Sequence, residues 1–282
     1  MQIGVNQKRK KNFFKGDKMN IESMDFGYII KPGEKGTDLR YSLRSIAKHY
    51  PKNKVWIQGN KPTWVTNVEY LPVKQTGTKW SNSTNNVIEA CKCEAISEDF
   101  ILMNDDFFCI DPTLPLEIII DSSLGLIDDV IDRYKKMRGD WAKGFIYINE
   151  LMDKLKLPKP YYSYEAHLPL RINKEKFLEV ISLPEVLKFM QTSKVLHKRT
   201  LYKNYDRPET INVLNHDVKV TKGKDKALEF IKVCGWLSTA DDIIGNPKYP
   251  QLNRFLVKNL SESCKFEIKN AQNKHKKDKF VF

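Results

Sequence analysis

The polar residues with the clearest chemical potential follow directly after a short apolar run. The run Phe100-Ile-Leu-Met103 leads into Asn104, Asp105 and Asp106, and two phenylalanines come next. Carboxylate oxygens suit Mg²⁺ or Mn²⁺, and such ions complete their coordination shell with phosphate oxygens and water. In an extended chain Asn104 and Asp106 face one side and Asp105 the other. We therefore predict Asp106 as the metal ligand with Asp105 supporting it; a simple Asn-Asp-Asp turn is the structural alternative.

Two residues further along could act on a hydroxyl or a phosphate. His167 lies in Ala166-His-Leu-Pro169, and its near-neutral pKa suits it to removing a proton from a hydroxyl. Arg199 carries a guanidinium, which can bind phosphate through two parallel hydrogen bonds. Each residue also has a purely structural alternative. His167 could be a histidine hydrogen-bonded in a loop, and Arg199 could be one of many arginines and lysines in a basic protein. Asp241 and Asp242 are compatible with a helix cap.

Short apolar runs alternate with amphipathic segments, which predicts the elements that position these residues. Strands are predicted over 26–30, 54–58, 67–71 and 100–103, and helices over 37–48, 85–95, 126–137 and from about 174. This alternation indicates an α/β fold with a mainly parallel sheet covered on both faces. Ligands bind beyond the carboxyl ends of such strands, so the loop 31–36 and residues 104–106 are expected to border a site. The absence of a Gly-rich phosphate loop or G-x-G-x-x-G argues against P-loop and Rossmann dinucleotide chemistry.

The composition limits the class of protein and the kinds of partner that we expect. The chain has 282 residues, of which 41% are hydrophobic, so we expect a globular core and exclude wholesale disorder. The net charge of +13 favours polyanionic partners, although part of the excess lies in basic end segments expected to be solvated tails. Five cysteines without C-x-x-C spacing support neither a disulfide framework nor a zinc site. With no membrane-length apolar run and no signal-like segment, a cytoplasmic protein is expected.

Several ordered segments resemble the Stealth family of bacterial capsular-polysaccharide sugar-phosphate transferases, relatives of the catalytic subunit of the lysosomal-enzyme N-acetylglucosamine-1-phosphotransferase. The matching segments are Asp38-Leu-Arg-Tyr-Ser-Leu-Arg-Ser-Ile46, Val55-Trp-Ile with Pro62-Thr-Trp64, Asn85-Asn-Val-Ile-Glu89, Phe100 to Phe108 and Ala166-His-Leu-Pro169. The resemblance is strong over 25–112 and weak over 160–245. The family's opening V-Y-T-W-V-D/N-G segment reads Tyr28-Ile-Ile-Lys-Pro-Gly33 here, so its acidic or Asn ligand is missing.

This resemblance implies a GT-A-like nucleotide-diphosphosugar fold with a helical C-terminal part. It implies a transferase, dependent on Mg²⁺ or Mn²⁺, that moves a sugar or sugar-1-phosphate from a UDP-sugar to a hydroxyl of an anionic polymer acceptor. Release of UMP would mark phosphotransfer and release of UDP glycosyl transfer, and the sequence leaves both open. The functional residues implied are Asp105, Asp106, His167 and Arg199. We further expect the donor to contact Arg40 and Arg44 on the polar face of helix 37–48, and Asn85, Asn86 and Asn104.

The expected organisation is a single catalytic domain over 23–264, between a basic N-terminal segment (1–22) and a basic tail (265–282). Its core would span 25–112, with the second half of the site in 113–264. Two other function classes stay open. The charge of +13 would suit a phage-type glycosyltransferase acting on modified DNA bases. The missing opening segment would suit a non-catalytic binding protein with a degenerate transferase fold. The sequence does not predict an oligomeric state.

Overall fold

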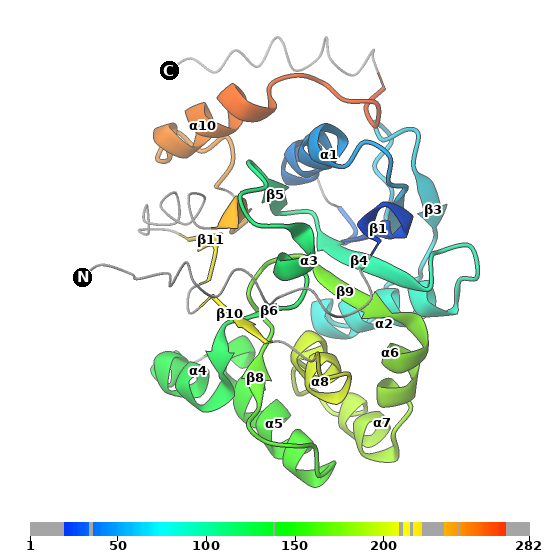
Figure 1. Cartoon of the computed structure of the whole chain (residues 1–282), viewed down its shortest axis with the longest axis vertical. Coiled ribbons are helices and arrows are strands. Elements are labelled where there is room, and N and C mark those ends of the chain that lie inside the picture. Colours follow the sequence, from blue (N-terminus) through cyan, green and yellow to red (C-terminus); the bar gives the residue numbers. More distant parts are fainter. Residues whose placement is uncertain are drawn as a thin grey trace.

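A five-stranded sheet forms the centre of the molecule, with the strand order β3-β2-β1-β4-β9 (Figure 1). The structure is a computed structural model that describes residues 20–33, 36–137, 139–208, 211–214, 217–221, 234–241 and 243–268. The central strands are β1 (Asp25–Ile30), β2 (Val55–Gly59), β3 (Glu69–Leu71), β4 (Asp99–Asn104) and β9 (Leu170–Asn173). β1 to β4 pair in parallel and only the edge strand β9 is antiparallel. The prediction of a mixed α/β fold with a mainly parallel sheet is therefore confirmed.

Helices cover both faces of this sheet. In Figure 1, α1 and α10 lie on one side of β1 and β4, while α2 and α6 lie on the other. The described helices are α1 (Thr37–His49), α2 (Lys79–Lys92), α3 (Leu116–Ile119), α4 (Ile127–Tyr134), α5 (Asp140–Lys154), α6 (Lys174–Ile181), α7 (Pro184–Met190), α8 (Lys198–Tyr205) and α10 (Pro250–Leu260), with a 3-10 turn, η2 (Ile21–Ser23). Phe26, Tyr28 and Ile30 of β1 are fully buried, as expected for a strand with two covered faces.

A second, three-stranded sheet lies beside the central one. It consists of β5 (Phe107–Cys109), β12 (Trp236–Thr239) and β11 (Lys219–Val220), in the order β11-β12-β5. β5 follows β4 after a two-residue turn, so this sheet brings C-terminal residues next to the carboxyl end of β4. Two short strand pairs complete the sheets: β10 (Asn212–Val213) with β6 (Ser122–Ser123), and β7 (Gly125–Leu126) with β8 (Tyr162–Ser163).

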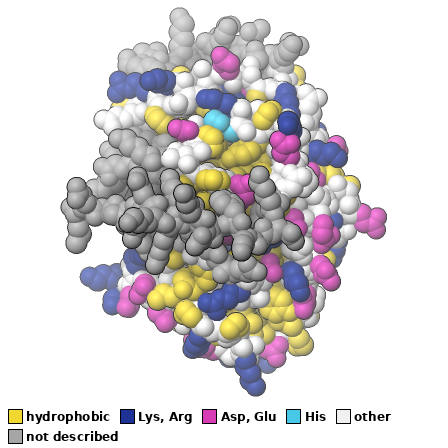
Figure 2. All heavy atoms as spheres, in the orientation of Figure 1, with side chains coloured by type: hydrophobic (Ala, Val, Ile, Leu, Met, Phe, Trp, Pro, Cys, Tyr) yellow, Lys and Arg dark blue, Asp and Glu magenta, His cyan; other side chains and the backbone are white. Residues whose placement is uncertain are grey.

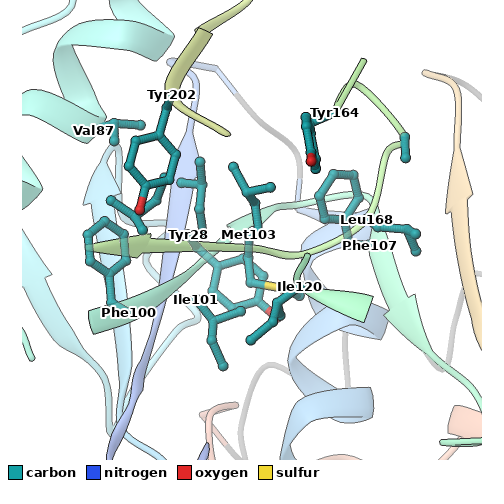
Figure 3. Packing of buried hydrophobic residues seen from close by; sticks show 14 of the residues in the cluster. Tyr28, Val87, Phe100, Ile101, Met103, Phe107, Ile120, Tyr164, Leu168 and Tyr202 are labelled. Atoms are coloured by element: carbon teal, nitrogen blue, oxygen red, sulfur yellow. The ribbon is translucent and has the colours of Figure 1, made fainter. Parts of the chain in front are cut away.

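One large apolar cluster joins the N-terminal sheet to the helical C-terminal part. Figure 3 shows Tyr28, Met103 and Phe107 from the sheets together with Tyr164 and Tyr202 from the later half of the chain. None of the described helices combines the length and the apolar composition that a membrane span requires. On the face shown in Figure 2, basic and acidic side chains are interspersed over the described surface.

Three predicted boundaries need correction. The helix expected over 85–95 is α2, which begins at Lys79, because the Thr78 hydroxyl accepts a hydrogen bond from the Ser81 backbone N–H and caps an earlier start. The helix expected over 126–137 ends at Tyr134. Within the tail expected from residue 265, Phe266 and Glu267 are buried and therefore belong to the packed part of the chain. Residues 1–19 and 269–282 of the two expected terminal segments lie outside the described residues.

A candidate active site at the carboxyl ends of β1 and β4

Asp106 lies in the turn between β4 and β5. The turn exists because β4 ends at Asn104, and Asp105 and Asp106 reverse the chain before the apolar β5 begins. Asp106 is buried, and its Oδ2 accepts hydrogen bonds from the Lys219 Nζ at 3.1 Å and the Ser238 hydroxyl at 2.8 Å. Both partners come from the second sheet. The predicted aspartate is therefore held by residues more than a hundred positions later in the chain.

His167 faces another carboxylate from the C-terminal half. Its Nδ1 lies 2.8 Å and 2.9 Å from the two side-chain oxygens of Asp217. A carboxylate only accepts hydrogen bonds, so the neutral ring carries its proton on Nδ1 and keeps a lone pair on Nε2. The Trp141 ring stacks at 6.2 Å from the imidazole. The backbone of His167 has a φ of +51°, a left-handed conformation that non-glycine residues rarely adopt.

Asp217 and Lys219, just before and at the start of β11, connect His167 to Asp106. Asp217 and Lys219 are two positions apart, and the Lys219 backbone N–H donates to the Asp217 carboxylate at 3.1 Å. The Lys219 side chain in turn reaches Asp106. His167, Asp217, Lys219 and Asp106 thus form one continuous chain of contacts. The structure brings the predicted histidine and the predicted aspartate together through two residues that the sequence analysis did not single out.

Arg199 lies near the same group of charges. Its Nη2 donates to the Leu168 carbonyl and its guanidinium lies 5.4 Å from the Phe107 ring centre. Burial lowers the pKa of Arg199, and three carboxylates oppose this effect: Glu165, Asp106 and Asp217. The Nε atom is buried without a hydrogen-bond partner. A buried donor without a partner is costly, and a bound anion is one way to satisfy it.

Glu165 holds the start of α8 beneath the site. Its Oε1 accepts from the Thr200 backbone N–H at 3.3 Å, which places a negative charge at a helix N-terminus. Burial alone would raise the pKa of Glu165, but His197, Arg199 and Lys198 hold it below its ordinary value. Burial lowers the pKa of Lys198 to about 8, and its Nζ donates to the Ser83 hydroxyl of α2 at 2.7 Å. The segment around Arg199 is therefore a buried, mutually paired charge cluster.

The predicted asparagines lie at the same edge of the sheet. Asn104 ends β4 beside Ile29 of β1. Asn86 is fully buried on α2, and a Cβ placed on Gly59 at the end of β2 would lie 3.0 Å from its Oδ1, which has no hydrogen-bond partner. Asn85 is half-buried on the same helix. Their contact with a donor stays a prediction.

Arg40 and Arg44 have protein partners instead of an open phosphate site. Both guanidinium groups contact the buried Glu267 carboxylate, Arg44 through two bonds of 2.6 Å and 3.0 Å. Arg44 also donates to the carbonyls of Leu260 and Ser261. These contacts fasten α1 to the chain that follows α10. Both guanidinium groups therefore form a buried ion pair with Glu267, a counter-charge that the local helix pattern does not reveal, and their contact with a donor stays a prediction.

Asp241 is exposed and lies 3.4 Å from the Lys31 ammonium. Asp242 lies outside the described residues.

The expected Mg²⁺ or Mn²⁺ does not fit the residues as they are arranged. Within the described ranges, no three His, Cys, Asp or Glu side chains are grouped so as to hold a metal ion. More directly, the Lys219 ammonium already contacts the Asp106 carboxylate at 3.1 Å, and a divalent cation on the same oxygen would face a like charge. The second predicted ligand, Asp105, lies in the same turn.

Asp217 and Lys219 carried a signal in the sequence that could have been used. The segment Asp217-Val-Lys-Val220 alternates polar and apolar residues, the pattern of a half-buried strand with both charged side chains on one face. Ser238 and Trp141 carried no comparable signal, since a single serine or tryptophan has no pattern of its own. Their roles depend on chain segments that meet only in the folded molecule.

Comparison with known proteins gives structural neighbours but no sequence relatives. No family model and no curated protein sequence matches the chain. Among solved structures, the chain is similar to the galactosyltransferase LgtC in complex with donor and acceptor sugar analogues, with 9% identity, a TM-score of 0.49, and 89% of this chain and 100% of that chain covered. An active-site mutant of LgtC aligns with 10% identity and a TM-score of 0.47, covering 86% and 98%. At such identity, residue roles do not transfer from LgtC to this chain.

Proposed function

We propose that the chain is a transferase that moves a sugar or sugar-1-phosphate from a UDP-sugar to a hydroxyl of a polymer, such as a capsule- or teichoic-type polysaccharide. One observation carries the proposal: the contact chain that links His167 to Asp106 at the carboxyl edge of the sheet. Such edges are where α/β sheets bind ligands. The segments that resemble sugar-phosphate transferases suggest the same reaction class, although no family model matches the chain.

His167 serves as the general base in this proposal. The Asp217 carboxylate accepts a hydrogen bond from Nδ1–H, which keeps the proton on Nδ1, so the Nε2 lone pair is available for the acceptor hydroxyl. The stacked Trp141 ring limits the freedom of the imidazole. Asp217 also favours the imidazolium that forms when His167 has accepted the proton. This arrangement needs no further base.

The bond that breaks defines the two versions of the reaction. In phosphotransfer, the acceptor oxygen bonds to the sugar-linked phosphorus, the bond from that phosphorus to the nucleotide breaks, and UMP leaves. In glycosyl transfer, the acceptor oxygen bonds to the anomeric carbon, the bond from that carbon to phosphate oxygen breaks, and UDP leaves. In both, the hydroxyl proton goes to His167 and the nearby Arg199 stabilises negative charge on the phosphates.

Mass spectrometry of the products separates these reactions. The purified chain is incubated with a panel of UDP-sugars, and polysaccharide, teichoic acid and DNA are offered as separate acceptors. We expect UMP or UDP to appear together with an acceptor whose mass has grown by the matching sugar-phosphate or sugar. Reactions without protein and reactions without acceptor are the controls. Growth of the DNA acceptor alone would assign the reaction to DNA modification, and no transfer from any donor would contradict the proposal.

A further inference from the structure

We propose that Lys219 and Arg199 hold the phosphate groups of the ligand directly, with no divalent cation between them and the protein. This inference rests on the proposed function and names the way in which the site binds its anionic donor. It differs from the metal dependence expected from the sequence.

Lys219 places a positive charge against the Asp106 carboxylate, where the sequence predicts a metal ion. Its Nζ lies 3.1 Å from Asp106, and its side chain is only 23% exposed, so the ammonium is held in a defined position. An ammonium has three N–H donors, and the contact with Asp106 uses one of them. The remaining donors can meet phosphate oxygens while the Asp106 contact is kept. A lysine is an established phosphate ligand of this point-charge kind.

Arg199 supplies the second cation. It is 8% exposed, and its Nε has no hydrogen-bond partner in the structure. A guanidinium offers five N–H donors in a planar fork. The one side-chain hydrogen bond described for Arg199 goes from Nη2 to a backbone carbonyl, so much of this fork is unused by the described residues. An anion that accepts from Nε would remove the cost of a buried, unsatisfied donor.

Lys219 would also connect the phosphate site to the base, His167. Lys219 contacts Asp106 through its side chain and Asp217 through its backbone N–H. Asp217 holds His167. A phosphate bound at Lys219 would therefore lie next to a residue that is two positions from Asp217, the carboxylate that orients the base. A divalent cation at Asp106 would have to displace the Lys219 ammonium and would disturb these contacts.

Calorimetry with two probes tests the proposal on the full chain. Inorganic pyrophosphate reports on the phosphate site independently of the base, and UDP adds the nucleoside. Each is titrated in the presence of EDTA and again in the presence of Mg²⁺ or Mn²⁺. We expect the affinity in EDTA to lie within about threefold of the affinity with metal. Lys219→Met should weaken binding of both probes by about tenfold or more, the scale of one charge-assisted contact.

Two matched variants keep the test specific. Lys219→Arg retains the positive charge and should bind within a few-fold of the wild type. Lys176→Met removes an exposed lysine of α6 that pairs with Glu179, and it should leave binding unchanged. Thermal unfolding of each variant shows whether it is folded, and the wild-type comparison in EDTA does not depend on any variant.

The outcomes separate this inference from the proposed function. Binding that requires Mg²⁺ or Mn²⁺ would overturn the direct contact but leave the transferase proposal standing. Lys219→Met that binds pyrophosphate as well as the wild type would also overturn it. If neither probe binds under any condition, the proposed nucleotide-sugar site fails and the inference fails with it.

Discussion

Two groups of charged and hydroxyl side chains, the block Asp38 to Ile46 of α1 and the group around Asp106, differ in how completely the protein uses them. In the α1 block, Arg40 and Arg44 pair with Glu267, and the Ser42 and Ser45 hydroxyls contact backbone groups of β5. Around Asp106, the buried Arg199 keeps an unpartnered Nε. A distinctive sequence segment can therefore form structural contacts, while the cations around Asp106 keep donors that a ligand could use.

The difference follows from what each group faces. The α1 block lies between β5 and the chain after α10, so protein partners surround it on both sides (Figure 1). Tyr28 illustrates this, since its hydroxyl contacts Ser42 at 2.9 Å inside the core. The second group lies where β4 ends, and its side chains come from the β4–β5 turn, the segment around β11, the chain before β9 and the start of α8. Variants of each group should accordingly affect different measurements.

The largest effect is expected from Glu267→Ala. It leaves two arginine side chains, only 13% and 14% exposed, without their counter-charge. Removing one partner of a buried ion pair costs about 3–5 kcal/mol, and we expect a loss of this size in the free energy of unfolding measured by urea denaturation. Glu262→Ala, an exposed neighbour, is the control. A large loss of turnover in protein that is still folded would instead assign the α1 block to the active site.

The next largest effect, on turnover and not on the free energy of unfolding, is expected from His167→Asn. Asparagine tolerates the positive φ at this position, so the backbone can be kept while the base is lost. Turnover should fall about 10²-fold or more, the usual effect of losing a general base, with UDP affinity nearly unchanged. His49→Asn, a histidine that contacts the Ile110 carbonyl, is the matched control for turnover. If His167→Asn lowers the free energy of unfolding but not turnover, the two groups are not distinct in the way proposed here.

A smaller effect is expected in how the stability that Glu267 contributes depends on pH. Burial alone would raise the pKa of Glu267, but Arg44 and Arg40 hold it below its ordinary value. A carboxyl with a depressed pKa contributes stability that is present above its unfolded pKa, near 4.3, and is lost as pH falls through the folded value. The stability difference between the wild type and Glu267→Gln should therefore be constant near neutral pH and shrink below about pH 4. A difference that stays constant down to pH 3 would show that the carboxylate charge contributes nothing.

The sequence by itself determined the order of the main elements. The strands predicted from short apolar runs over 26–30, 54–58 and 100–103 appear as β1, β2 and β4, because a strand covered on both faces is mostly apolar on both sides. It also determined that β4 ends at Asn104 and that Asp105 and Asp106 form the turn after it, since Asn and Asp are typical turn residues after a strand. The helix boundary at Lys79 was missed because the capping residue Thr78 precedes the apolar pattern.

The partners of the charged residues were decided only by the tertiary structure. Arg40 and Arg44 share a helix face in any α1, but the carboxylate that pairs with them is more than two hundred residues away. Likewise, His167 and Asp106 meet through Asp217 and Lys219 because β11 pairs with β12 and β12 with β5. Local periodicity describes which side of an element a residue occupies. It does not describe which distant charge lies opposite, and in a buried site that charge determines whether a side chain stabilises the fold or remains available to a ligand.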